Sequence, residues 1–285
     1  MLRLIRCDAS THWAFQSQTP RVYHSGLRSS PWWDEQQFEI VKSLESAYAG
    51  RGKTAILREL DTVIKGREGA KVRRGGNIRA ENSAEWSFGD RENGLERVFT
   101  PHIGVRGDTD AVENDGAGGW SEFGPIFDGL DFSESRCSAL PTLCKVLKEH
   151  IHGEMCGLTR DELQSYREEG VVVEERLRKV VDSRCGADTI ATVLRLRPGT
   201  NILPHCGTTN KRLIMHFALK GAEGVKFRAG DSKESDAPGG WIESYGNGDG
   251  HAVIFDDSFE HTVRHDGAHD RYVLLVVLRH PDVRL

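Results

Sequence analysis

Three polar residues in the second half of the chain have types and positions that suit a metal ion and an anion. His205 follows the residues ILP, His261 ends the segment DDSFEH, and Arg271 comes directly before the apolar run YVLLVVL. All three are expected at strand edges. Imidazole binds Fe(II), Zn(II) and Cu(II) alike, so the two histidines predict a metal site without selecting the metal. A buried guanidinium is costly unless a carboxylate meets it, so Arg271 indicates a dicarboxylate ligand.

Each histidine taken alone is more simply a packed or exposed residue, and other interpretations of the set stay open. A zinc hydrolase would use the two histidines but leaves Arg271 unexplained. A non-catalytic β-sandwich binding module would have no reason to keep all three residues. The histidines can converge on one ion if the fold is a jelly roll or barrel, in which strands distant in sequence become neighbours. Three further histidines, His251, His265 and His269, are expected at the surface.

The strands needed for such a fold are predicted after residue 186. Apolar and β-branched residues there form short runs separated by Gly, Asp and Asn turns, which is typical of an antiparallel sandwich or barrel. These runs are residues 189–199, 212–219, 225–228, 251–255 and 271–278. The predicted fold class is mainly β with flanking helices. We expect a single domain over residues 1–285, in which residues 186–285 form the strand-rich core that carries the three polar residues.

Residues 1–185 are predicted to be an N-terminal helical and loop region packed on that core. Apolar positions recur at helical spacing in residues 20–65, after an Asp34 that can cap, and predict two helices. Trp32 and Trp33 precede this cap and are interpreted as a packing anchor, with ligand contact as the alternative. Residues 139–182 predict two more helical pieces. Residues 66–119 show no period and are expected to be a solvated loop or a lid.

Composition limits the classes of partner. The chain has 285 residues and a formal net charge of −5, which provides no positive field for nucleic acid or an anionic membrane surface. It has neither a membrane-spanning apolar window nor the apolar core of a secretory signal, so a cytoplasmic protein is expected, with an organelle transit peptide as the alternative. The six cysteines form no CxxC pair and are expected to be reduced thiols.

Two long motifs surround the histidines, RPGTNILPHCGTTNKRLIMHFAL and IFDDSFEHTVRH. They resemble the aspartyl/asparaginyl β-hydroxylase family of Fe(II)- and 2-oxoglutarate-dependent oxygenases, and RVYHSGLRSSPWWD looks like the segment that precedes the core in that family. The resemblance is strong over residues 194–281 and weak over residues 20–65. It implies a distorted double-stranded β-helix, or jelly roll. It also implies hydroxylation of an unactivated carbon with O2, with halogenation as a minor alternative.

The resemblance further implies roles for individual residues. Fe(II) is held by His205 and His261 only, because Gly207 stands where relatives outside the family have a carboxylate ligand. Asp257 orients a water in the position left open. Without the family, Asp257 would be interpreted as a turn residue.

For the co-substrate, the resemblance places Arg271 at the distal carboxylate of 2-oxoglutarate and His216 near its metal-chelating end. A lone histidine on an apolar strand would otherwise be a packed core residue. Arg212 is predicted to be a third co-substrate residue or, alternatively, a partner in a surface ion pair. Leu194 replaces a family serine that helps to hold the co-substrate, and Ile214 replaces an arginine that contacts the peptide substrate. The predicted substrate is therefore a peptidyl amino acid or, as the alternative, a free amino acid or small metabolite.

Overall fold

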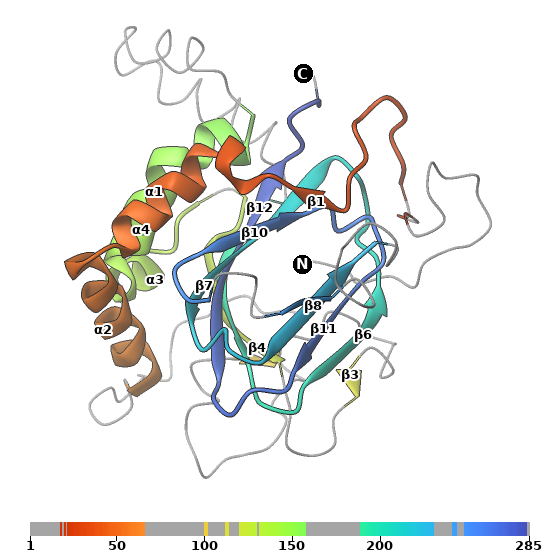
Figure 1. Ribbon diagram of the computed structural model, residues 1–285. Coiled ribbons are helices and arrows are strands. Elements are labelled where there is room, and N and C mark those ends of the chain that lie inside the picture. The colour runs from red at the N-terminus through yellow and green to blue at the C-terminus, as the bar shows by residue number, and fades with distance from the viewer. Residues whose placement is uncertain are drawn as a thin grey trace, which may run out of the picture.

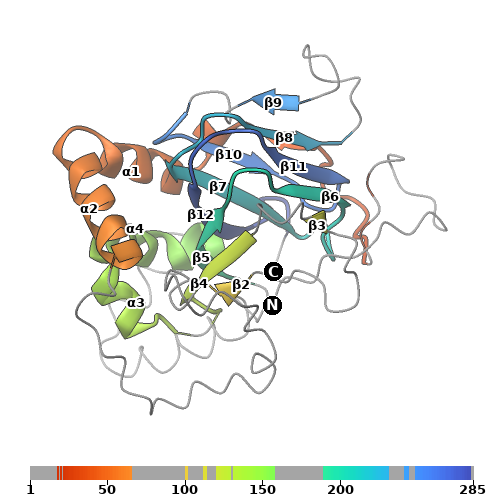
Figure 2. The ribbon, with the colours of Figure 1, turned by 90° about the horizontal axis from the view of Figure 1, so that it is seen from below.

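Two antiparallel β-sheets lie one above the other, and helices cover the outer side of the larger sheet (Figures 1 and 2). The computed structural model describes residues 18, 20, 22–65, 100–101, 112–113, 120–129, 131–157, 189–230, 241–243 and 248–283. Within these residues, the strand order is β1-β10-β7-β12-β5-β4-β2 in the larger sheet and β3-β6-β11-β8-β9 in the smaller one. Every strand pairing in both sheets is antiparallel.

The strands have the following bounds in chain order: β1 Trp32–Trp33, β2 Thr100–Pro101, β3 Val112–Glu113, β4 Trp120–Phe127, β5 Ala191–Leu196, β6 Asn201–His205, β7 Arg212–Lys220, β8 Val225–Ala229, β9 Trp241–Glu243, β10 Ala252–Phe255, β11 His261–His265 and β12 Arg271–Arg279. The five strands predicted after residue 186 are confirmed as β5, β7, β8, β10 and β12. Together with the helices, the sheets give a mixed architecture of helices and two antiparallel sheets.

The two helices predicted in residues 20–65 are confirmed as α1 (Glu39–Tyr48) and α2 (Arg51–Lys65). Asp34 does cap, but it caps the short 3-10 turn η1 (Glu35–Gln37) that precedes α1, where its carboxylate accepts from the backbone N–H of Gln36. The buried face of α1 packs into the apolar cluster outside the larger sheet. No helix in the described ranges is both long and apolar enough to cross a membrane.

The helical piece predicted from residue 139 is confirmed as α4 (Pro141–His150), which continues into a π turn over Ile151–Met155 and is preceded by α3 (Glu134–Ala139). The second piece of that prediction and nearly all of the expected loop 66–119 lie outside the described residues. Glu59, in the middle of α2, accepts hydrogen bonds from the backbone N–H and the hydroxyl of Thr142, so α2 is joined to the first turn of α4.

β7 and β12 are buried on both faces, which explains why both strands are continuous apolar runs in the sequence. Side chains alternate across a sheet. On β12, Leu274 and Val276 join the cluster under the helices, whereas Val273 and Leu275 join the cluster between the two sheets. We call the side of the larger sheet that faces the smaller sheet the inner face. The candidate site residues of β7 and β12 lie on this inner face.

The N-terminal half also supplies strands, which the sequence did not predict there. β4 pairs with β5 and extends the larger sheet, while β1 pairs with β10 at its other edge. The pairing of β4 with β5 shifts register between Glu122 and Pro125, and Gly124 has a φ of 91°. These irregularities break the alternation that identifies a strand in a sequence.

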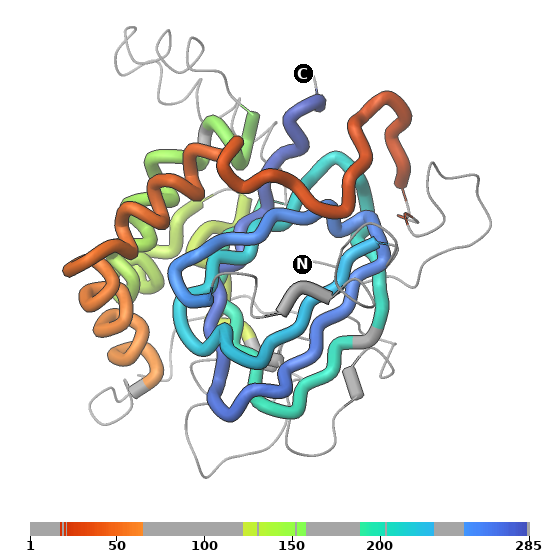
Figure 3. The backbone as a smooth tube through the Cα atoms, viewed as in Figure 1, coloured from red at the N-terminus to blue at the C-terminus, as the bar shows by residue number. Residues whose placement is uncertain are grey.

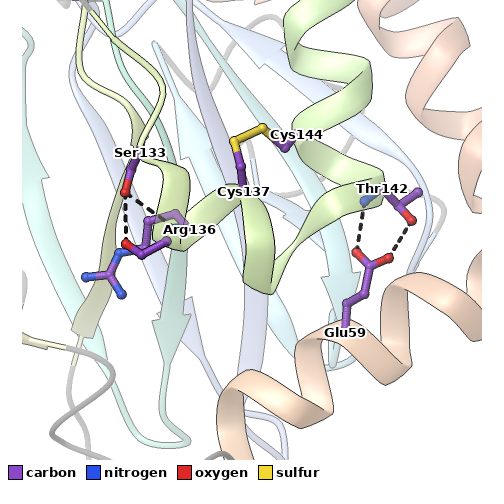
Figure 4. Close-up of a disulfide and its surroundings, with 7 residues drawn as sticks. Glu59, Ser133, Arg136, Cys137, Thr142 and Cys144 are labelled. Atoms are coloured by element: carbon purple, nitrogen blue, oxygen red, sulfur yellow. Dashed lines mark hydrogen bonds between the residues drawn. A yellow bond between two sulfur atoms is a disulfide. The ribbon is translucent and has the colours of Figure 1, made fainter. Parts of the chain in front are cut away.

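The expectation of reduced cysteines is wrong. Cys137 of α3 and Cys144 of α4 form a disulfide with a Cα–Cα distance of 5.2 Å (Figure 4). Cys156 and Cys206 are disulfide-bonded as well. The chain turns between α3 and α4 at Leu140, which brings two cysteines seven residues apart to bonding distance. The spacing of two cysteines in a sequence does not reveal the angle between the helices that carry them, so the sequence did not predict this disulfide.

Candidate functional site

His205 and His261 lie directly opposite each other on neighbouring strands. His205 is the last residue of β6, His261 is the first residue of β11, and the two are cross-strand partners. Their ring centroids are 4.1 Å apart, and the side chains are buried. Residues that pair across antiparallel strands project to the same side, so both imidazoles point to one place. Among the residues that the structure describes, no group of three or more His, Cys, Asp or Glu side chains gathers in this way.

The imidazole of His261 has a defined orientation. Its Nδ1 lies 2.9 Å from the carbonyl oxygen of Phe259, and since a carbonyl can only accept, Nδ1 carries the proton. The lone pair is then on Nε2, which is the arrangement found in metal-binding histidines. Burial lowers the pKa of His261 to about 4, the charge of Arg212 contributes in the same direction, and the hydrogen bond to Phe259 opposes both. The ring is therefore neutral at physiological pH.

His216 and Arg271 lie on the inner face of the larger sheet. His216 of β7 pairs with Leu275, and Arg271 begins β12 opposite Leu196 of β5. Both side chains are buried. Burial holds the pKa of His216 well below its usual value, and the nearby Arg271 and His261 lower it further. The sequence prediction placed these residues around one ligand, and the structure brings them onto one face.

Asp257 and Arg212 form a buried ion pair. The Nη2 atom of Arg212 lies 2.7 Å from Oδ2 of Asp257, and the two side chains are 6% and 5% exposed. Arg212 begins β7, at the same parity as Ile214 and His216, so the pair belongs to the inner face. The alternative prediction for Arg212 was a surface ion pair. Arg212 does form an ion pair, but the pair is buried and does not lie at the surface.

Gly207 lies against Asp257. Its backbone N–H donates to the Asp257 carbonyl oxygen, and a Cβ at this glycine would overlap the Asp257 carboxylate. The structure thus brings Gly207, which follows His205 by two residues, into contact with the residue predicted to orient a water. The sequence spacing alone did not predict this contact between Gly207 and the Asp257 carboxylate, because the two residues are 50 positions apart in the chain.

Two phenylalanines that the sequence analysis did not single out border the histidines. The ring of Phe227 stacks on His261 with centroids 6.1 Å apart, and Phe255 lies 5.2 Å from both His216 and His261. Trp32 contacts both phenylalanines and is half-buried, so its predicted packing role is confirmed. The signal for the phenylalanines was present in the alternation of the strands VKFR and HAVIF. The result is an apolar wall on one side of the imidazoles.

Described residues before β1 contact the loops that carry the site residues, and Figure 3 shows in red how the chain from residue 22 runs into β1. Gln18 is buried and donates to Asp256 and Ser258, on either side of Asp257. The N–H of Val22 donates to the carbonyl of Thr208, just after Gly207. The sequence resemblance over residues 20–65 is weak, yet this segment directly supports the loops beside His205 and His261.

One expectation about the remaining histidines is wrong. His265 was expected at the surface, but it is fully buried and its Nε2 lies 2.7 Å from the carbonyl oxygen of His269. Burial lowers the pKa of His265, while that hydrogen bond opposes the effect. The reason is its position on β11, where it shares the parity of His261 and Val263 and so faces inward. His269 is exposed, and the His251 side chain is 44% exposed.

Comparisons with known proteins agree with the sequence resemblance. The family model described as aspartyl/asparaginyl beta-hydroxylase matches residues 172–281. The chain is 26% identical to the mouse (Mus musculus) aspartyl/asparaginyl beta-hydroxylase over 276 residues, which cover 95% of this chain and 26% of that protein. It is 38% identical to the mouse aspartate beta-hydroxylase domain-containing protein 2 over 96 residues, which cover 33% of this chain and 25% of that protein.

A solved structure from Burkholderia pseudomallei, described as an oxidoreductase of the 2OG-Fe(II) oxygenase family, is 13% identical with a TM-score of 0.31, covering 59% of this chain and 71% of that one. The similarity to the hydroxylases rests on the sequence matches and not on this structural likeness. The chain spans about a quarter of the length of the two curated relatives. The family model and the relative matched along nearly the whole chain are both described as aspartyl/asparaginyl beta-hydroxylase, so the chain is similar to this family.

Proposed function

We propose that this chain is an Fe(II)- and 2-oxoglutarate-dependent oxygenase that hydroxylates an unactivated carbon of its substrate with O2. The observation that carries the proposal is the direct juxtaposition of two buried imidazoles, those of His205 and His261, with centroids 4.1 Å apart. The two facing antiparallel sheets also support the finer description of the fold as a distorted double-stranded β-helix.

The residues present fit an iron ion. His205 and His261 offer imidazole nitrogens, which suit Fe(II), and burial keeps His261 neutral so that its lone pair is available. Gly207 has no donor, and the space that its side chain would need is taken by the Asp257 carboxylate. In this proposal the two histidines hold the metal, and Asp257 orients a water beside it. When bound, iron and 2-oxoglutarate supply the oxidising chemistry with O2.

The residues also fit a dicarboxylate co-substrate. Arg271 is buried on the inner face and would bind the distal carboxylate of 2-oxoglutarate through a bidentate contact. His216 lies within the electrostatic influence of both Arg271 and His261, so it would approach the part of the co-substrate between the arginine and the metal. Its neutral ring can donate one hydrogen bond there without adding a charge.

The apolar wall supports a site from which water is excluded. Phe227 and Phe255 are fully buried against His261 and His216, and Trp32 covers both phenylalanines. Charged interactions are stronger in such surroundings than in water, which strengthens binding of the co-substrate carboxylates. Water exclusion also protects reactive species from side reactions.

The substrate is proposed to be a peptidyl amino acid or, as a second candidate, a free amino acid or small metabolite. A specific observation favours the second candidate. Ile214, at the position of the family's substrate-binding arginine, is 2% exposed and belongs to the apolar cluster between the sheets, as does Leu194. An aliphatic side chain gives no charge-assisted hydrogen bond to a substrate carboxylate.

Anaerobic titration with Fe(II), with and without 2-oxoglutarate, tests the proposal. We expect the wild type to bind iron more tightly with 2-oxoglutarate present and to release succinate when O2 is admitted. His205→Ala and His261→Ala should lose iron binding, whereas the control His251→Ala, at a partly exposed histidine, should bind as the wild type does. Iron binding that is indifferent to 2-oxoglutarate would favour a binding module. Binding of Zn(II) with hydrolytic turnover would favour a zinc hydrolase.

A further inference from the structure

The carboxylate of Asp257 is held unequally by Arg212. Nη2 of Arg212 donates to Oδ2 over 2.7 Å, whereas Nε approaches Oδ1 only to 3.5 Å. A charge-assisted N–H···O bond is strongest near the shorter of these distances. Oδ2 is therefore the oxygen that the guanidinium fixes, and Oδ1 has only a weak contact with it.

The guanidinium is brought to this place by strand alternation. Arg212, Ile214 and His216 occupy alternate positions of β7, and the latter two face the inner side of the sheet. Arg212 lies at the strand end nearest the loop that contains Gly207. The two charged side chains are nearly excluded from solvent, so neither would be stable there without the other.

Asp257 is also held through its backbone. Its carbonyl oxygen accepts a hydrogen bond from the N–H of Gly207, which places Asp257 beside the loop that directly follows His205. The backbone contact fixes where residue 257 lies, and the contact with Arg212 fixes how its side chain is turned. A carboxylate that is to orient a water near the metal needs both.

We propose that Arg212 is a positioning residue of the iron site, which acts through Asp257 and does not bind the co-substrate itself. The inference rests on the proposed function, because it takes His205 and His261 as the iron ligands. Partners of this kind, one contact removed from the metal, change metal affinity or activity when mutated. Arg212 in this arrangement has a role that differs from its sequence prediction as a co-substrate residue.

A double-mutant cycle tests the proposal. The variants are Arg212→Met, Asp257→Asn and the two combined, and the dissociation constants of Fe(II) and of 2-oxoglutarate are measured separately under anaerobic conditions. We expect each single change to weaken iron binding by about 10- to 100-fold. The combined variant should be no weaker than Asp257→Asn alone, because residues that act through one contact are not additive. The 2-oxoglutarate affinity of the iron-saturated protein should stay close to that of the wild type.

A matched control is Arg264→Met, which removes an arginine of β11 from its pair with Asp266, just after the strand; this arginine is 60% exposed. It should bind both ligands as the wild type does. Arg212→Lys retains the charge near Asp257 and should restore part of the iron affinity. If Arg212→Met does not fold, as judged by circular dichroism and thermal melting, Arg212→Lys takes its place in the cycle.

Two results would overturn the proposal. One is a multiplicative loss of iron affinity in the combined variant, and the other is a loss of 2-oxoglutarate affinity in Arg212→Met with iron binding intact. The first would mean that Arg212 affects iron binding by a route other than Asp257, and the second would assign Arg212 to the co-substrate. Wild-type protein that binds no iron would instead defeat the proposed function. If the wild type binds iron and Arg212→Met binds iron with the same affinity, this inference fails but the proposed function stands.

Discussion

Asp257 places its carboxylate in the space beside Gly207 that the first side-chain atom of any other residue would occupy. Gly207 does not have a positive φ, so its backbone conformation is open to other residues. The need for glycine here arises from the contact with Asp257 and not from the conformation of the chain. The two residues come from separate loops, one after β6 and one after β10.

Gly207→Ala is therefore expected to destabilise the protein by about 1–3 kcal/mol, the usual range for an overpacked site, and to weaken iron binding by turning Asp257 away. Urea denaturation measures the first effect and anaerobic iron titration the second. In an Asp257→Ala background the overlapping carboxylate is gone, so Gly207→Ala should then cost much less stability. An equal cost in both backgrounds would show that the contact with Asp257 is not the reason for glycine.

Arg271→Met should raise the KM for 2-oxoglutarate. Removing one partner of a buried charge pair costs about 2 kcal/mol or more, which corresponds to roughly 30-fold or more in affinity. Since the contact is to the end of the co-substrate distant from the metal, kcat at saturating co-substrate should change less than KM. Steady-state kinetics with varied 2-oxoglutarate measures both, and an unchanged KM would remove Arg271 from the site.

Asp256 should make stability depend on pH. Burial, with the neighbouring Asp257 charge contributing, raises the pKa of Asp256 from 3.8 to about 7. A folded-state pKa above the unfolded value means that the folded protein binds more protons between these two values. The contribution of Asp256 to stability is therefore complete below about pH 4, falls as the pH rises through this window and is lost above about pH 7.

Urea midpoints measured between pH 4 and pH 8 check this expectation. Asp256→Asn keeps the shape of the side chain without a titrating proton, so its midpoint should fall less over the same range than that of the wild type. The comparison between the two proteins removes contributions of other groups. Parallel curves would contradict the prediction.

The disulfide between Cys137 and Cys144 should stabilise the fold without affecting the site. The two cysteines are seven residues apart in sequence, and loop-closure entropy for so short a loop gives about 2–3 kcal/mol. Replacing both by serine should lower the free energy of unfolding by this amount in urea titrations. Because α3 and α4 pack on the face of the larger sheet opposite the inner face, iron binding by the folded variant should match that of the wild type. Loss of iron binding would mean that the helices position the site.

The sequence alone predicted the elements whose pattern is local. Apolar periodicity predicted α1, α2 and α4 and the strands β5, β7, β8, β10 and β12. An element that buries one or both faces needs apolar residues at regular positions close together in the sequence. β4 was missed because its register shifts near Gly124 and Pro125 interrupt that pattern. The same analysis singled out His205, His261 and Arg271 by residue type and surroundings.

Only the tertiary structure decided which of these residues meet. Three contacts could not be derived from sequence separation: the 4.1 Å approach of the His205 and His261 rings, the buried pair of Arg212 with Asp257, and the disulfide between Cys137 and Cys144. The burial of His265 also became evident only in the structure. The physical reason is that side-chain type and period depend on each residue's own burial, whereas contacts depend on sheet order and register. Those are set by the whole chain packing at once.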